Sequence, residues 1–252
     1  MKKAILTLFT FSIAAVTIAQ TQSGKVTYEE IITFKIDLEG EAAQFASMMP
    51  KEQKGTKVLH FNQDASIFMS PQKTEDEEIS RTTENGSHFK FKIGRADEKA
   101  YCDLKKNKKL EQKDFMSRKF LVESDIQTSN WKLTGKQKTI LGYPCQEAVK
   151  EDSTKKTTVW FTPAIPVSVG PAGSEGLPGL VLAMEANNGE YVLNATSVEA
   201  GKEDVALLVK PSEGKKMSRE AYTKMVEEKT EEMRKEYGGS GNGNVIIKMR
   251  TN

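Results

Sequence analysis

Short segments in which apolar and polar residues alternate recur along the whole chain. In residues 88–93, with the sequence HFKFKI, the two phenylalanines and the isoleucine fall on one face and the polar residues on the other. A period of two is typical of an antiparallel sheet that packs on one side only. On this basis we predict strands at 26–36, 57–61, 66–69, 88–93, 100–104, 119–123, 145–150, 157–162, 180–186 and 191–198.

Helical periodicity is confined to two segments. Residues 218–237 begin at a capping Ser218, carry a sparse apolar stripe and stop at two glycines. A shorter helix is predicted at 41–49 and is ended by Pro50. No linker divides residues 20–237, so we expect one β-rich domain with this C-terminal helix, followed by a glycine-rich linker and short tail strand at 238–252.

The predicted fold is mainly β, a single curved antiparallel sheet or half-barrel. A sheet with one apolar face has to cover that face. The sequence leaves three candidates for the cover, which are a second sheet, the C-terminal helix or a bound apolar ligand.

The N-terminus has the pattern of a signal peptide. Lys2 and Lys3 precede an apolar stretch at 4–18, which at about fifteen residues is shorter than the roughly 20 that a membrane-spanning helix needs. Cleavage after Ala19 leaves Gln20 first, and no cysteine follows that accepts a lipid. We therefore expect residues 1–19 to be removed, and an exported protein, periplasmic or secreted, without a transmembrane segment.

Charge argues against nucleic-acid binding. The chain has 37 basic and 35 acidic residues, so removal of Lys2 and Lys3 leaves 35 of each. Phosphate binding normally requires a basic excess on one face. The local basic run at 105–109 is followed by Glu111 and Asp114, and we interpret it as a solvated turn.

The two cysteines, Cys102 and Cys145, are interpreted as a disulfide. An even count in an oxidising compartment favours a bridge, and closing this loop stabilises the fold by about 4 kcal/mol in the chain-entropy model. Two buried free thiols or a metal pair are the alternatives.

The segment 131–182 carries a distinctive series of motifs. It contains Trp131, the run LGYPCQEA at 141–148 with Gly142 and Tyr143, Trp160-Phe161, Pro166, Gly170-Pro171 and GLPGLV at 176–181. In order and spacing it resembles the GLPGLI family of exported proteins, found chiefly in Bacteroidetes. The resemblance implies an exported, largely β protein without established activity. By fold analogy it also suggests the curved half-barrels of lipoprotein carriers.

The same segment predicts an ordered loop between two strands. Its prolines restrict φ and remove backbone donors, and its glycines permit close backbone approach. Leu177 and Leu180 flank Pro178-Gly179, next to Val181, and are expected to enter the open face of the sheet. The loop therefore either fills the core or serves as a lid or contact surface; its candidate residues are Gly170, Pro171, Gly176, Leu177, Pro178, Gly179, Leu180 and Val181, supported by Trp131, Gly142, Tyr143, Trp160, Phe161 and Pro166.

Recognisable catalytic and metal-binding motifs are lacking. The only histidines, His60 and His88, lie in predicted strands and outside any H-E-x-x-H arrangement, and the chain has no G-x-S-x-G or P-loop sequence. The acidic run 75–78 lacks the glycine turn of a calcium loop. We predict no metal and no cofactor. The triplet at 152–154, DST, matches a short acceptor pattern for O-linked sugars.

These patterns favour a non-catalytic binding or accessory protein of the cell envelope. One version holds an apolar small molecule on the concave sheet face. Another presents the GLPGLV loop to an envelope protein. A hydrolase with an atypical carboxylate site is the alternative from another class.

Overall fold

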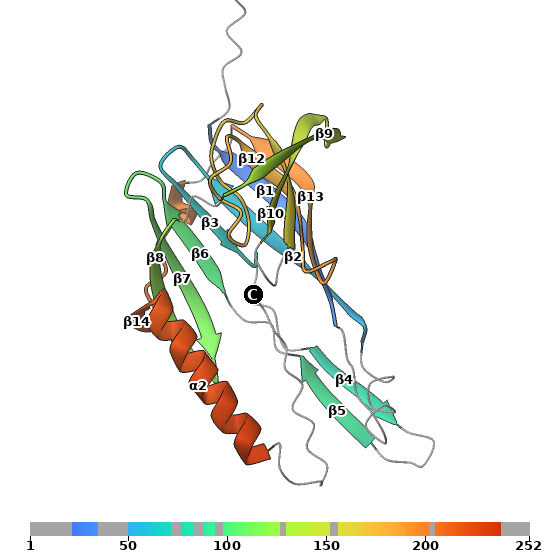
Figure 1. Cartoon of the computed structure of the whole chain (residues 1–252), viewed down its shortest axis with the longest axis vertical. Coiled ribbons are helices and arrows are strands. Elements are labelled where there is room, and N and C mark those ends of the chain that lie inside the picture. The colour runs from blue at the N-terminus through green and yellow to red at the C-terminus, as the bar shows by residue number, and fades with distance from the viewer. Residues whose placement is uncertain are drawn as a thin grey trace, which may run out of the picture.

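Most of the strands form one long open sheet (Figure 1). The computed structural model describes residues 22–34, 50–71, 77–82, 88–93, 98–126, 130–151, 156–201 and 205–237. Twelve strands join in the order β14-β8-β7-β6-β3-β2-β1-β13-β12-β11-β10-β9, and β4 and β5 form a separate pair. The strands are β1 (Gly24–Thr33), β2 (Glu52–Phe61), β3 (Ala65–Met69), β4 (Glu77–Thr82), β5 (His88–Ile93), β6 (Lys99–Asp103), β7 (Lys108–Phe115), β8 (Arg118–Asp125), β9 (Lys132–Ile140), β10 (Tyr143–Glu151), β11 (Lys156–Thr162), β12 (Leu180–Ala186), β13 (Tyr191–Ala200) and β14 (Lys215–Ser218).

The mainly β fold and the C-terminal helix are confirmed. Each of the ten predicted segments falls on a strand, and the helix α2 (Arg219–Tyr237) follows Ser218, whose Oγ accepts a hydrogen bond from the Ala221 N–H at 3.2 Å. The periodicity did not indicate β4, β7, β9 or β14. One expectation was wrong in detail, because β14 pairs with β8 in parallel and the sheet is not antiparallel throughout.

Several predicted features lie outside the described residues. These are the signal peptide at 1–19, the helix at 41–49, the triplet 152–154, and the linker and tail strand at 238–252. Among the residues that are described, no helix has the length and apolar character needed to cross a membrane.

The loop between β11 and β12 covers one face of the sheet. We call residues 163–179 the motif loop and the face that it covers the inner face. Ile165, Val167 and Val169 are buried and alternate with exposed residues, as in an extended strand. They pack with Leu177 against side chains of six neighbouring strands, which include Val26, Tyr28, Leu59, Phe61, Cys145, Ala148, Val159, Phe161, Leu182, Met184 and Leu193.

Backbone hydrogen bonds hold the motif loop against the start of β12. The N–H of Leu180 donates to Ile165 O at 3.1 Å, and the N–H of Val181 donates to Val169 O at 3.1 Å. A Cβ on Gly179 would lie 2.2 Å from Thr162 O, so only glycine permits this approach. The buried hydroxyl of Tyr28 donates to Val181 O at 2.6 Å. Leu177 and Leu180 are 3% and 0% exposed, as the sequence predicted.

The opposite face of the sheet has a smaller apolar cluster. Ala65, Ile67 and Tyr101 on β3 and β6 are buried there, with Leu208 packed against them. Leu208 follows the short 3-10 helix η1 (Val205–Leu207). Lys210 lies 5.2 Å from the centre of the Tyr101 ring and donates to Asp103 Oδ2 at 3.0 Å. The chain before β14 therefore covers this part of the outer face.

The burial of Leu177 generates a test of the loop as part of the core. We expect Leu177→Asp to unfold the protein or to lower its free energy of unfolding by several kcal/mol, because a buried unpaired charge is strongly destabilising. Thermal and urea denaturation measure the effect. The control is Ala172→Asp in the same loop, where the side chain is exposed and φ is 50°, a conformation that Asp tolerates. Equal stability of the two variants would contradict the core role of Leu177.

Candidate functional site

Charged side chains continue the inner face where the apolar core ends. The strand register pairs Phe61 with Ser66, Ser66 with Cys102, and Cys102 with Lys109, and directly paired residues share one face of a sheet. Phe61, Ser66, Cys102 and Lys109 are 0%, 2%, 2% and 6% exposed. This row therefore runs from the core to a buried lysine on β7.

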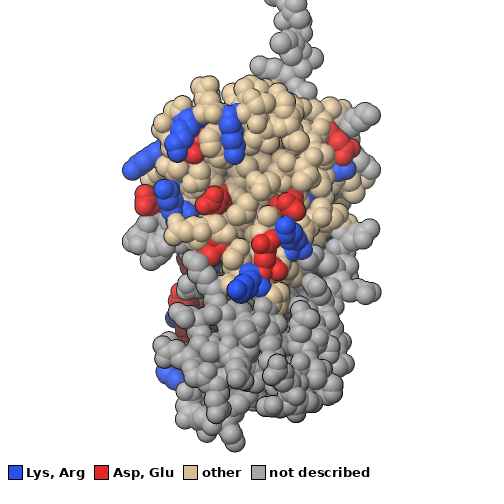
Figure 2. Space-filling model, turned by 90° about the vertical axis from the view of Figure 1, so that its right-hand side faces the viewer, with Lys and Arg blue, Asp and Glu red and all other residues tan. Residues whose placement is uncertain are grey.

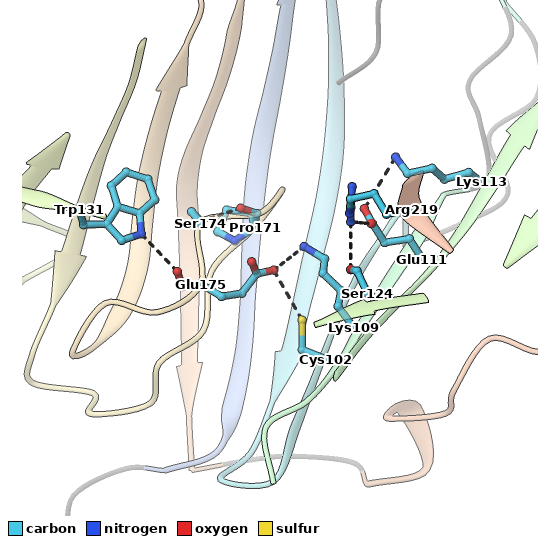
Figure 3. A network of polar contacts seen from close by, with 10 residues as sticks. All are labelled: Cys102, Lys109, Glu111, Lys113, Ser124, Trp131, Pro171, Ser174, Glu175 and Arg219. Atoms are coloured by element: carbon cyan, nitrogen blue, oxygen red, sulfur yellow. Dashed lines mark hydrogen bonds and ion pairs between the residues drawn. The ribbon is translucent and has the colours of Figure 1, made fainter. Parts of the chain in front are cut away.

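Lys109 binds the motif loop through a buried ion pair (Figure 3). Its Nζ donates to Glu175 Oε1 at 2.8 Å, and the two side chains are 7% and 6% exposed. The indole Nε1 of Trp131 donates to the backbone oxygen of Glu175 at 3.2 Å. A lysine on β7 and a tryptophan just before β9 thus hold Glu175 in place. The sequence interpretation of 105–109 as a solvated turn fits Lys105 and Lys106 but is wrong for Lys109.

The predicted disulfide between Cys102 and Cys145 is absent, and both thiols are free and buried. Six strands separate β6 from β10 in the sheet, whereas a disulfide requires β-carbons about 4 Å apart. Cys102 Sγ donates to Glu175 Oε1 at 3.5 Å, and Cys145 Sγ donates to Tyr143 O at 3.4 Å. The parity of cysteines along a chain carries no information on which strands become neighbours.

Burial and charge set the protonation of this group. Burial, followed by the neighbouring Glu175 carboxylate, raises the pKa of Cys102 to about 12, so the thiol is protonated and a poor nucleophile. Burial alone would lower the pKa of Lys109, but the carboxylates of Glu175 and Glu111 outweigh it and the pKa is raised. Lys109 is therefore a permanent cation whose role is to pair with Glu175.

A second ion-pair group follows on the same face of β7. Glu111 and Lys113 succeed Lys109 at a spacing of two, and Lys113 Nζ lies 3.7 Å from Glu111 Oε1. Arg219, the first residue of α2, donates to Glu111 Oε2 and, at 3.3 Å, to Ser124 Oγ. Tyr222 of α2 contacts Phe120 of β8 with ring centres 5.6 Å apart. Glu111 thus attaches the start of α2 to the sheet.

Glu98 lies beside this group with the opposite pKa shift. Burial raises the pKa of Glu98, although Lys113 and Lys57 partly oppose the effect. The pKa of Glu111 is lowered because Lys109, Lys113 and Arg219 outweigh the cost of its burial. A carboxyl group whose pKa is raised beside one whose pKa is lowered occurs in general acid–base sites and also in structural ion-pair networks. Among the described residues, no three His, Cys, Asp or Glu side chains come together as a metal site.

The other candidate residues of the motif segment are distributed around the loop. Trp160 lies on β11 with Lys138 Nζ 4.2 Å above its ring, and Phe161 beside it is buried. Leu141 and Gly142 form the β9–β10 turn, with φ values of 50° and 84°, and Tyr143 begins β10. In the loop, Gly170, Pro171 and Gly179 are buried, as is Val181 on β12, whereas Pro166, Gly176 and Pro178 are exposed. The structure therefore gathers these residues around the core.

Two hollows among the described residues are open and lined mostly by polar residues. One is lined by Gln22, Ser23, Asn62, Gln63 and Asp64 and has a volume of about 290 Å³. The other, of about 450 Å³, is lined mainly by Thr27, Glu29, Lys54, Thr56 and Thr196. The apolar inner face is instead filled by the motif loop. On the surface shown in Figure 2, basic and acidic side chains alternate and form no continuous basic patch.

Comparison with known proteins places this architecture in a family. The family described as "N-glycanase peptide, N-terminal domain" matches residues 45–223, and the chain belongs to it. Two solved structures of PNGF-II, one in space group P21 and one in C2, are similar in fold, with TM-scores of 0.53 and 0.51 and 20% sequence identity each. They cover 81% of this chain, which spans only 33% and 32% of theirs. No curated protein matches the chain in sequence.

The Lys109–Glu175 pair generates a prediction on stability. We expect Lys109→Met and Glu175→Gln each to destabilise the fold, by about 3 kcal/mol or more for Lys109→Met, because each leaves its partner unpaired in the interior. The double variant should be less destabilised than the sum, as measured by urea denaturation. The neighbouring exposed pair Lys108–Asp125, at 2.6 Å, is the matched control and should show much weaker coupling. Additive effects at Lys109 and Glu175 would contradict the pairing.

The raised pKa of Glu98 generates a prediction on pH dependence. A folded-state pKa above the unfolded value of about 4.3 means that ionised Glu98 destabilises the fold at neutral pH. Glu98→Gln should therefore raise the free energy of unfolding at pH 7. This gain should disappear below about pH 4, because Glu98 is then protonated in both the folded and the unfolded state of the unsubstituted protein. Denaturation curves across this range measure it. The exposed Glu123→Gln on β8 is the control, and a gain that does not depend on pH would contradict the assignment.

Proposed function

We propose that this chain is an exported, non-catalytic accessory module that binds a partner protein of the cell envelope involved in glycan processing. The observation that carries the proposal is the family match, in which nearly the whole β body corresponds to an N-terminal domain. The matched part of this chain covers only 33% and 32% of the PNGF-II chains of similar fold. We propose that this body, like an N-terminal domain of a longer protein, holds another protein body next to itself.

Export is part of the proposal and has its support in the sequence. The charged and apolar pattern of residues 1–19 is that of a cleaved leader, and the resemblance of 131–182 to the GLPGLI family points to the same compartment. Both cysteines are free thiols, so the stability of the fold does not depend on disulfide formation in an oxidising compartment.

The packing of the inner face favours a protein partner over an apolar small molecule. A carrier needs an apolar cavity that encloses most of its ligand. Here the motif loop fills the inner face with its own side chains, and Leu177, Leu180 and Val181 are buried. The GLPGLV residues are thus structural for the most part, and the surface that meets a partner has to lie elsewhere.

A second candidate function rests on Glu98 and Glu111. The pKa of Glu98 is raised and that of Glu111 is lowered, which is the difference that separates the acid from the base in a hydrolase site. If the chain is such a hydrolase, Glu98→Gln will abolish a hydrolytic activity that the exposed-site variant Glu123→Gln retains. The ion pair of Glu111 with Arg219 favours the structural reading.

The accessory role is tested by isolating the complex. In-cell crosslinking in the source organism, followed by mixing of the purified chain with the recovered protein, should give a defined heterocomplex by size-exclusion chromatography. The exported chain should begin at Gln20. The chain alone should release no glycan from a denatured N-glycosylated glycoprotein. Glycan release by the chain alone would overturn the non-catalytic assignment, and failure to reconstitute any complex would overturn the accessory role.

A further inference from the structure

The strand β9 is an open and unusually exposed edge of the sheet. Among the described residues it pairs with β10 alone, and eight of its nine residues are exposed (Figure 1). The other end of the sheet is different, because β14 has four residues and continues directly into α2. An edge strand presents unpaired N–H and C=O groups that can pair with an added strand.

The side chains of β9 have one sign of charge. Its sequence, KLTGKQKTI, contains three lysines and no acidic residue. Lys136 pairs with Glu147 of β10 at 3.1 Å, and Lys138 lies over the Trp160 ring. Because one carboxylate faces three lysines, the strand keeps a positive charge. Leu133 and Leu141, near its two ends, are 59% and 47% exposed. The edge thus combines free backbone groups, positive charge and two apolar side chains.

This charge pattern selects among the occupants of the edge. A second copy of the chain that paired edge to edge would bring the lysines of two β9 strands together, and like charges on neighbouring strands are destabilising. The same lysines attract an acidic strand. Edge lysines therefore act against self-association while they leave the edge available to a partner of opposite charge.

We propose that β9 is the docking edge of this protein and that it binds an extended, acidic polypeptide segment of the partner as an added strand. The inference rests on the proposed accessory function and identifies the surface that performs it. Lys132 and Lys138 supply the charge complementarity, and Leu133 and Leu141 supply apolar contacts at the two ends of the added strand. Gly135, with a φ of 82°, lies in a bulge of β9. This bulge divides the pairing of β9 with β10 into two short stretches.

Peptide binding to the full chain tests the inference. The probe is a synthetic peptide as long as the nine residues of β9, in which Glu and Val alternate. Its two comparison peptides are a Lys–Val version and a Glu–Val version N-methylated at every residue, which keeps the charge but removes the N–H donors on both edges of the strand. We expect fluorescence anisotropy to show binding of the first peptide only, weakened at high salt.

Variants locate the binding on the protein. Lys132→Glu together with Lys138→Glu should weaken binding of the Glu–Val peptide by about tenfold. The matched control reverses two exposed lysines on α2, Lys224→Glu with Lys235→Glu, and should leave binding unchanged. Melting curves verify that both variants fold.

Three results would overturn the docking edge. They are no binding of the Glu–Val peptide, equal binding of its N-methylated form, and equal loss of binding in the β9 and α2 variants. The accessory function has a separate outcome. A reconstituted heterocomplex whose crosslinks avoid β9 would refute the docking edge and retain the accessory function. Peptide binding without any heterocomplex would retain the docking edge and refute the accessory function.

Discussion

The need to cover the inner face of the sheet is the constraint on which this structure depends. Strands with one apolar side remain stable only if something excludes water from that side. The motif loop does so as an extended segment, with Ile165, Val167 and Val169 alternating into the core and Leu177 closing it. The glycine at 179 allows the loop to approach Thr162 closely, and the backbone bonds to β12 give it a fixed position. The loop is therefore a structural layer of the fold.

The interior changes from apolar to charged across the sheet, and the motif loop serves both parts. Leu177 of the loop packs in the core, and Glu175 of the loop forms an ion pair with Lys109 on β7. A buried ion pair contributes little net stability compared with apolar packing, but it costs several kcal/mol to break. The pair thus makes the position of the loop specific. On the next residues of β7, Glu111 does the same for α2 through Arg219.

A filled interior leaves the outer surfaces and edges for recognition. The family match connects this body with an N-terminal domain, and the PNGF-II structures share its fold. The basic β9 edge, which projects from the end of the sheet, offers backbone pairing and charge to an acidic strand, whereas β14 at the opposite end is short and joined to α2. Glu175 and Glu111 are instead committed to ion pairs with Lys109 and Arg219.

The sequence by itself determined the local structure, because strand alternation, helix capping and proline-glycine loops are written in neighbouring residues. It predicted ten strands, the C-terminal helix and the burial of Leu177 and Leu180. It missed β7 and β9, where lysines stand at strand positions and no apolar alternation marks them. Only the tertiary structure decided that Lys109 is buried, that Cys102 and Cys145 stay apart and that β9 is an edge. Each of these features depends on which strands become neighbours. That arrangement is set by contacts between residues far apart in the chain, such as Lys109 and Glu175.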